Sequence, residues 1–302
     1  MVGYERKLLD FLHREHPDIF NYQPVNRITS GTANIVFITG GDEPWVFRFP
    51  RTDNEFAIGA MQREIILMPL LVDNMPIHIP RFKYMSSDAS PYVYVGYPML
   101  QGEHLDVHQY HALDSQQQMR LSQDIGNFLS ALHSFHAVPY FPSELFHNNV
   151  MKQQQQFFYE LFRQDVASYL SSNINGWIDT VYLKFLSDSD RFSFSPCLIH
   201  GDLKTDHIIF NHEKRVLSGI IDLGLKIGDP AYDLGLLPYG NDFIEGVLDA
   251  YKCPIDAYFR ERVQFYFQTR HLFALRHSVI HNDKKLFNDC IEAIHEIMKQ
   301  ST

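Results

Sequence analysis

The chain has 302 residues, of which 45% are hydrophobic, and this is enough apolar material for one large domain or two moderate lobes. Charged residues make up 21% of the sequence, so the composition excludes a wholly disordered protein. The formal net charge is -10. An acidic chain is unsuited to neutralising a nucleic-acid backbone, whereas it is compatible with a cationic small-molecule ligand.

The three cysteines, Cys197, Cys253 and Cys290, lie far apart and form no Cys-x-x-Cys pair. An odd number at this spacing matches neither a disulfide framework nor a zinc site, so we expect a reducing compartment. The first 13 residues carry charged side chains where a secretory signal would be apolar. No apolar stretch reaches the roughly 20 residues of a membrane span. We therefore expect a cytoplasmic protein that binds neither nucleic acid nor membrane, and we favour a monomer.

The first hundred residues are predicted to be rich in strands. Residues 4–16 have the spacing of a short amphipathic helix that Pro17 ends. A second helix is expected from about residue 54 towards residue 75, ended or kinked at Pro69. Three β-branched or aromatic runs lie between these helices and two more follow the second helix, with turn-rich links between runs. The last two runs are expected to form a hairpin. These strands are predicted at residues 26–29, 35–39, 45–49, 80–85 and 92–97.

After residue 100 the pattern becomes mainly helical. The clearest amphipathic spacing covers residues 115–133. The exception is the segment 197–222, where two short strands are expected around a loop. A strand-rich first third and a helical remainder predict a two-lobed α+β protein with lobes at 1–100 and 101–302. Further helices are expected at residues 151–170, at 178–186, and from 229 to the end.

The segment from Cys197 to Phe210 is the most informative part of the chain. An apolar strand leads into His200-Gly201-Asp202, and another apolar strand follows His207. Further on, a buried strand delivers Asp222 just before Leu-Gly. Phosphoryl transfer needs one carboxylate to accept the proton of the attacking hydroxyl and further ligands to hold Mg²⁺ against the nucleotide phosphates. Either motif alone also occurs as a turn beside a buried strand, but the two in this order favour a phosphotransferase.

The two motifs resemble the catalytic and metal-binding loops of the aminoglycoside phosphotransferase family, which shares the protein-kinase fold. Within it the chain is most similar to the aminoglycoside 2''-phosphotransferases and the macrolide phosphotransferases, which tend to carry histidine at the place of His207. The resemblance implies that Asp202 is the catalytic base, Asp222 the main magnesium ligand and His207 a second metal-side ligand. Because histidine binds magnesium poorly compared with oxygen, His207 could instead act through hydrogen bonding.

The resemblance also implies which residues bind the nucleotide. Ser30 and Gly31 stand in a loop that the family folds over the phosphates. Arg48 occupies the place of the usual phosphate-binding lysine, and it keeps the charge but has a different reach. Macrolide phosphotransferases have a similar Trp-Val-x-Arg-x-Pro-Arg pattern. Glu64, in the following helix, is the expected partner of Arg48.

Three residues fall at the inter-lobe hinge, where the family binds the base of the nucleotide: Tyr97, Pro98 and Leu100. In the resembled subfamily a bulky aromatic side chain beside the hinge tends to disfavour adenine, and Tyr97 stands at about that place; Pro98 has no backbone donor to offer the base. We therefore expect GTP to be used at least as well as ATP. A shift of one residue in the alignment would turn Tyr97 to the other face of its strand.

Asp233 belongs to an Asp-Pro-x-x-Asp pattern of the family and is expected mainly to brace the catalytic loop, as is His133 at a helix end. In the resembled family, acidic groups of the C-terminal helices bind the ammonium groups of aminoglycosides. Asp242, Glu245 and Asp233 are therefore the candidate substrate contacts, although a solvated helix face explains such acids equally well.

Three functions stay open: magnesium-dependent phosphorylation of an aminoglycoside, the same chemistry on a macrolide or other small alcohol, and non-catalytic nucleotide binding.

Overall fold

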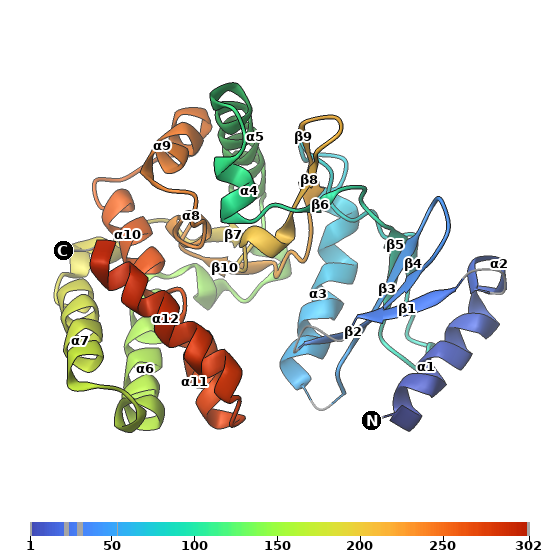
Figure 1. The fold of residues 1–302 in the computed structure, drawn as a ribbon, viewed down its shortest axis with the longest axis horizontal. Coiled ribbons are helices and arrows are strands. Elements are labelled where there is room, and N and C mark those ends of the chain that lie inside the picture. Colours follow the sequence, from blue (N-terminus) through green and yellow to red (C-terminus); the bar gives the residue numbers. More distant parts are fainter. Residues whose placement is uncertain (1, 21–23, 29–32, 53, 301–302) are drawn as a thin grey trace. The chain divides into compact units, whose positions relative to one another are not determined.

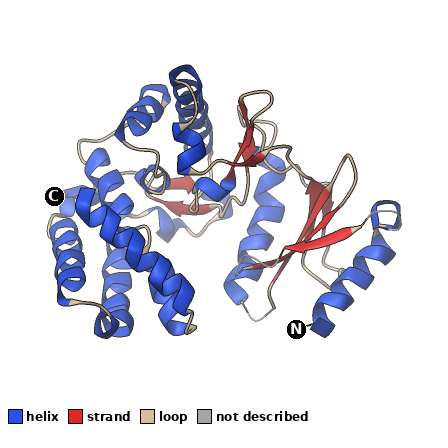
Figure 2. Ribbon diagram, in the orientation of Figure 1, coloured by secondary structure: helices blue, strands red, loops and turns tan. Residues whose placement is uncertain are grey.

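The computed structural model describes residues 2–20, 24–28, 33–52 and 54–300. The chain divides into two compact units: unit 1 contains residues 1–105 and 206–225, and unit 2 contains residues 106–205 and 226–302. The grouping differs from the predicted lobes in assigning the segments 101–105 and 206–225 to unit 1. The β-sheet of unit 1 and the helices of unit 2 give the α+β content that the sequence predicts (Figures 1 and 2).

Unit 1 is built on a five-stranded antiparallel sheet with the strand order β1-β2-β3-β5-β4. The predicted hairpin is present as β4 and β5, but both strands are shorter than expected because ladder pairing is confined to a few residues. The strands are β1 (Val25–Ile28), β2 (Asn34–Thr39), β3 (Trp45–Pro50), β4 (Tyr84–Met85) and β5 (Val95–Pro98).

Different helices cover the two faces of this sheet (Figure 1). Side chains alternate along β3, so its successive residues pack against different helices. Phe47 and Phe49 pack with α1 (Val2–Glu15) and α2 (Pro17–Phe20). Val46 packs on the other face with Met61 of α3 (Glu55–Leu71). By the same alternation, the next residue on the α3 face is Arg48. Pro69 lies inside α3, and the helix continues to Leu71 before it ends.

A second sheet joins the segment 206–225 to the rest of unit 1. Its strands β6 (Glu103–His104), β8 (Ile208–Asn211) and β9 (Val216–Ile220) lie in the order β6-β8-β9. Ile220 N also donates to the carbonyl oxygen of His78 at 3.0 Å. A Cβ atom at Gly219 would lie 2.3 Å from that same oxygen, so the close approach of the two backbones requires glycine.

Unit 2 is mainly helical (Figure 2) and contains one two-stranded sheet, β7 (Cys197–Ile199) with β10 (Lys226–Gly228). Helix α5 occupies the predicted range and begins with a capping box of Asp114 and Gln117. Within the described residues, no helix is long and apolar enough to span a membrane. The helices are α4 (Val107–His111), α5 (Ser115–His133), α6 (Asn148–Val166), α7 (Ser172–Leu186), α8 (Ala231–Gly235), α9 (Asn241–Ala250), α10 (Phe259–Thr269), α11 (Leu272–Ile280) and α12 (Lys284–Gln300). Short 3-10 turns lie at Val138–Tyr140, Ser143–Phe146, Ala167–Tyr169, Ser189–Phe192 and Thr205–His207.

Candidate active site

Arg48 is the centre of a buried ion-pair cluster in unit 1. Its side chain is 4% exposed. Nη2 donates to both carboxylate oxygens of Glu64 at 2.7 Å, and Nη1 donates to Oδ1 of Asp222 at 2.7 Å. The guanidinium therefore ties strand β3 to helix α3 and to the loop that follows β9. The expected partner Glu64 is in place, and the contact with Asp222 is an addition that the sequence did not predict.

The charges of this cluster stabilise one another, with Arg48 and Glu64 buried and Asp222 partly exposed. Burial acts to lower the pKa of Arg48, but the carboxylates of Glu64 and Asp222 outweigh it and the pKa is raised. Burial raises the pKa of Glu64 even though Arg48 opposes the shift. Arg48 serves both acids because its two terminal nitrogens point to different partners, which a single ammonium nitrogen would have to share. Its Nε is buried and has no hydrogen-bond partner among the described residues.

Asp222 has an unusual backbone conformation. Its φ of 56° lies in the left-handed region, which non-glycine residues seldom adopt. The neighbouring Ile221 N donates to the carbonyl oxygen of His207 at 2.9 Å and fixes the chain there. The Asp222 side chain is 42% exposed, and its Oδ2 lies 3.6 Å from Nε2 of the buried His207. Such conformations cost about 1–3 kcal/mol and cluster at functional sites.

The surroundings of Asp222 suit a magnesium ion that is held mainly by a bound nucleotide and only partly by the protein. Mg²⁺ usually binds one or two protein carboxylates and completes its octahedron with phosphate oxygens and water. Asp222 offers a partly exposed carboxylate, whereas His207 offers a nitrogen that magnesium disfavours. Across the described ranges no group of three or more His, Cys, Asp or Glu could hold a metal ion. The residues thus fit magnesium brought with a nucleotide, and they do not form a closed protein cage.

The predicted base, Asp202, lies in unit 2, two residues beyond the one that follows strand β7. Its carboxylate is about half exposed, and Oδ2 lies 3.1 Å from Nζ of Lys204. The preceding Gly201 has a φ of 78°, and a Cβ atom there would lie 2.5 Å from the side chain of Lys226. The positive φ therefore favours glycine in the turn before Asp202, whereas the flexible side chain of Lys226 could move aside.

Asp233 of α8 holds the loop that precedes Asp202 by hydrogen bonds to its backbone. Its fully buried carboxylate accepts hydrogen bonds from the backbone N–H groups of His200 and Gly201, each at 2.8 Å, and from Nε2 of His133 at 3.1 Å. His133 and the backbone donors keep the pKa of Asp233 below its usual value against the effect of burial. These contacts match a bracing role. They speak against Asp233 as a substrate contact, because both oxygens are used and neither is exposed.

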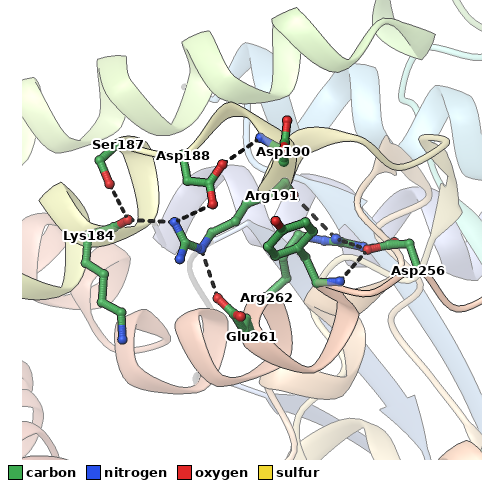
Figure 3. Close-up of polar contacts among 9 residues, drawn as sticks. Lys184, Ser187, Asp188, Asp190, Arg191, Asp256, Glu261 and Arg262 are labelled. Carbon is green, nitrogen blue, oxygen red and sulfur yellow. Dashed lines mark hydrogen bonds and ion pairs between the residues drawn. The ribbon is translucent and has the colours of Figure 1, made fainter.

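Helix α8 is in turn held by Arg262 of α10, which the sequence analysis missed. Arg262 is completely buried; its Nε donates to Asp229 Oδ2 at 2.7 Å, and Nη1 and Nη2 donate to Asp256 at 2.8 and 2.7 Å. Figure 3 shows the Arg262–Asp256 pair beside Arg191. Asp229 Oδ1 also accepts from Ala231 N at the start of α8. Burial raises the pKa of Asp229 to about 6, although Arg262 acts to lower it.

A family model described as the phosphotransferase enzyme family matches residues 24–266. The chain belongs to this family. Its fold is that of the kinase-like antibiotic phosphotransferases, with a β-sheet lobe and a helical lobe.

Three solved structures illustrate the likeness of this phosphotransferase to its family. The GDP and kanamycin complex of APH(2″)-IIia has a TM-score of 0.84 and 25% sequence identity, and the match covers 96% of this chain and 98% of that one. The streptomycin–ATP complex of APH(2″)-IIa has a TM-score of 0.69 and 20% identity over 95% of each chain. Macrolide 2'-phosphotransferase type I has a TM-score of 0.72 and 16% identity over 98% of this chain and 97% of that one.

The structure of this phosphotransferase places the predicted hinge residues at the end of β5. Tyr97 is buried with the cluster of Val46 and Met61, on the α3 face of the sheet, and stacks on Phe82 with ring centroids 5.5 Å apart. Burial raises the pKa of Tyr97, and the nearby Arg48 opposes the shift. Pro98 and Leu100 line a cavity of about 200 Å³ within unit 1.

The other predicted contacts are spread over the chain. Ser30 and Gly31 lie outside the described residues. Asp242 is exposed in the first turn of α9. Glu245, one turn further, is bound through both oxygens by Arg260 at 3.0 and 2.6 Å, and this contact lowers the pKa of Glu245. Glu245 and Arg260 line a cavity of about 760 Å³ in unit 2.

Proposed function

We propose that this protein transfers the γ-phosphoryl group of a nucleoside triphosphate to a hydroxyl group of an antibiotic, with an aminoglycoside as the first candidate. The observation that carries the proposal is the pairing of Arg48 with both Glu64 and Asp222. A fixed cation beside a carboxylate that can hold magnesium is what phosphate binding requires. Membership of the phosphotransferase family supports the reaction class, and the GDP and kanamycin complex of APH(2″)-IIia supports the two substrates.

In the proposed reaction, Asp202 accepts the proton of the acceptor hydroxyl. The freed oxygen bonds to the γ-phosphorus while the bond from that phosphorus to the β-phosphate oxygen breaks, and a nucleoside diphosphate leaves. Arg48 would donate hydrogen bonds to the phosphates, and Asp222 would hold the metal, with His207 beside it. Magnesium, when bound, would neutralise charge on the phosphate oxygens. The remaining nucleotide contacts of the proposal are Ser30, Gly31, Tyr97, Pro98 and Leu100.

GTP is proposed as a donor at least equal to ATP. Tyr97 is a bulky side chain on the same face of the sheet as Arg48, and this placement supports a role beside the nucleotide. Related structures hold GDP in one case and ATP in another, so the fold accommodates either base.

A macrolide is the second candidate acceptor, and one observation favours it. The 760 Å³ cavity of unit 2 has walls that include Val107, Leu237, Ile244 and Phe267. Among the described residues that line it, Glu245 is the one acid, and it is already paired with Arg260 (also a lining residue). Such a cavity suits an acceptor with a large apolar surface better than one with several ammonium groups.

The proposal is tested by measuring nucleoside diphosphate release with kanamycin, gentamicin, streptomycin and a macrolide, each with ATP and with GTP. Mass spectrometry of the acceptor must show the addition of one phosphoryl group. Asp202→Ala is the matched control, because it should bind nucleotide and transfer nothing. Nucleotide binding without transfer to any acceptor would instead identify a non-catalytic member of the fold.

We also propose that the protein is located in the cytoplasm. All three cysteines are free thiols, with Cys290 buried. Free thiols support the expectation of a reducing cytoplasm, and we keep the expectation of a monomer.

A further inference from the structure

The brace of the catalytic loop extends beyond Asp233 to a buried tyrosine. Tyr251 is the residue that ends helix α9, and it is 7% exposed. Its hydroxyl lies 2.8 Å from Nδ1 of His133, whose Nε2 lies 3.1 Å from Asp233. Asp233 in turn accepts from Gly201 N at 2.8 Å. Three successive hydrogen bonds thus lead from Tyr251 to the residue before Asp202.

The donor and acceptor roles in this series of hydrogen bonds are nearly fixed. A carboxylate can only accept hydrogen bonds, so Nε2 of His133 must be protonated and must donate the hydrogen bond to Asp233. Nδ1 then has the Tyr251 hydroxyl as its partner in either state of the ring: it accepts from the hydroxyl when neutral and donates to it when charged. Since the His133 and Asp233 side chains are both almost fully buried, water cannot readily replace this partner.

We propose that Tyr251 is a positioning residue of the phosphotransfer reaction, because it fixes the His133 ring and thereby the Asp233 carboxylate that holds the loop of Asp202. The inference rests on the proposed role of Asp202 as the base. Tyr251 does not touch the reacting groups itself. Its effect should therefore fall on turnover, which needs an accurately placed base, and should leave nucleotide binding in unit 1 unchanged.

Tyr251→Phe removes one oxygen atom and retains the ring. The matched control is Tyr182→Phe, because Tyr182 is also buried in unit 2 but stacks on Tyr159 and Phe265, away from this chain of hydrogen bonds. We expect Tyr251→Phe to lower kcat about tenfold, equivalent to about 1.4 kcal/mol, with the KM for nucleotide changed less than about twofold. Tyr182→Phe should lower the melting temperature without lowering kcat.

Two readouts do not depend on activity. In Tyr251→Phe the ¹⁵N resonances of His133 should shift and the amide of Gly201 should exchange faster with solvent, and neither should change in Tyr182→Phe. These measurements separate the inference from the proposed function, because they succeed or fail even if no acceptor is ever phosphorylated. Equal losses of kcat in both variants, or unchanged Gly201 exchange in Tyr251→Phe, would overturn the inference.

A second variant keeps the test decisive if Tyr251→Phe folds poorly. His133→Asn retains a donor towards Asp233 but is too short to bridge to Tyr251. We expect it to lower kcat as Tyr251→Phe does, and the double variant to lose no more than either single one. Additive losses would show that Tyr251 acts independently of His133 and would contradict the proposal.

Discussion

Replacing Arg262 by methionine tests how strongly the anchor of helix α8 depends on one buried charge. Methionine fills a similar volume without a charge. The change leaves Asp229, whose side chain is 2% exposed, without its counterion, whereas Asp256 is 31% exposed and can regain water. The cost should therefore come mainly from Asp229. Removing one partner of a buried ion pair typically costs about 3–5 kcal/mol, and we expect Arg262→Met to lower the free energy of unfolding by that amount.

The pH dependence of this loss follows from the pKa of Asp229. The pKa is about 6 in the folded protein, above the value of about 3.9 for an unfolded chain. A carboxyl group whose folded pKa is raised binds more protons in the folded state, so its contribution to stability falls as the pH rises through that window. Arg262 acts to lower this pKa, so the variant should have a still higher value. The destabilisation by Arg262→Met should thus be small near pH 5 and grow between pH 6 and pH 8.

Equilibrium urea unfolding of both proteins at several pH values measures this difference. Arg262→Met combined with Asp229→Asn is the matched control, because asparagine keeps an oxygen for Ala231 N and removes the stranded charge. The double variant should recover more than half of the loss at pH 8. A loss below about 1 kcal/mol, or a loss that is the same at pH 5 and pH 8, would refute the account of Asp229 as a buried charge balanced by Arg262.

Three further predictions concern the proposed reaction. Asp202→Ala should lower turnover by several orders of magnitude and leave nucleotide affinity nearly intact; retention of more than about a tenth of the turnover in steady-state kinetics would remove Asp202 as the base. Asp222→Ala should weaken magnesium-dependent nucleotide binding in calorimetry, and unchanged affinity would mean that the metal is held elsewhere. Tyr97→Ala should shift the preference between GTP and ATP towards ATP. If the wild type strongly prefers ATP, or if the substitution leaves the ratio of kcat/KM values untouched, Tyr97 does not select the base.

Helix α5 shows what local sequence is able to specify. Its predicted range, 115–133, is the observed range, because an apolar stripe runs along it and a capping box at Asp114 fixes its start. The β-sheet lobe and the helical lobe follow from the same kind of signal. The Arg48–Glu64 pair was also predicted, because the resemblance to the family marked Arg48 and the strand–helix order then pointed to Glu64 as its partner.

The missed features are those that depend on partners far apart in the chain. Strands β6 and β10 have two and three residues, too few to show any periodicity. The pairing of β6 with β8 joins residues that come before and after the segment 106–205 in the sequence. The sequence does not distinguish Arg262 from a solvent-exposed charged residue on a helix, because only the folded chain brings it to Asp229. Tyr251 gave no signal either, since its partner His133 lies on another helix.

The arginine at position 48, which departs from the usual lysine of the family, has a structural reason in the backbone of Asp222. A left-handed aspartate persists only where its surroundings hold it. Arg48 supplies that hold with one nitrogen while the other is bound to Glu64, so α3 and the loop that follows β9 are fixed by the same planar group. A lysine would have to divide one ammonium between the two acids and would orient neither of them as firmly. The charge that we propose to bind phosphate therefore also orients the carboxylate that we propose to hold the metal.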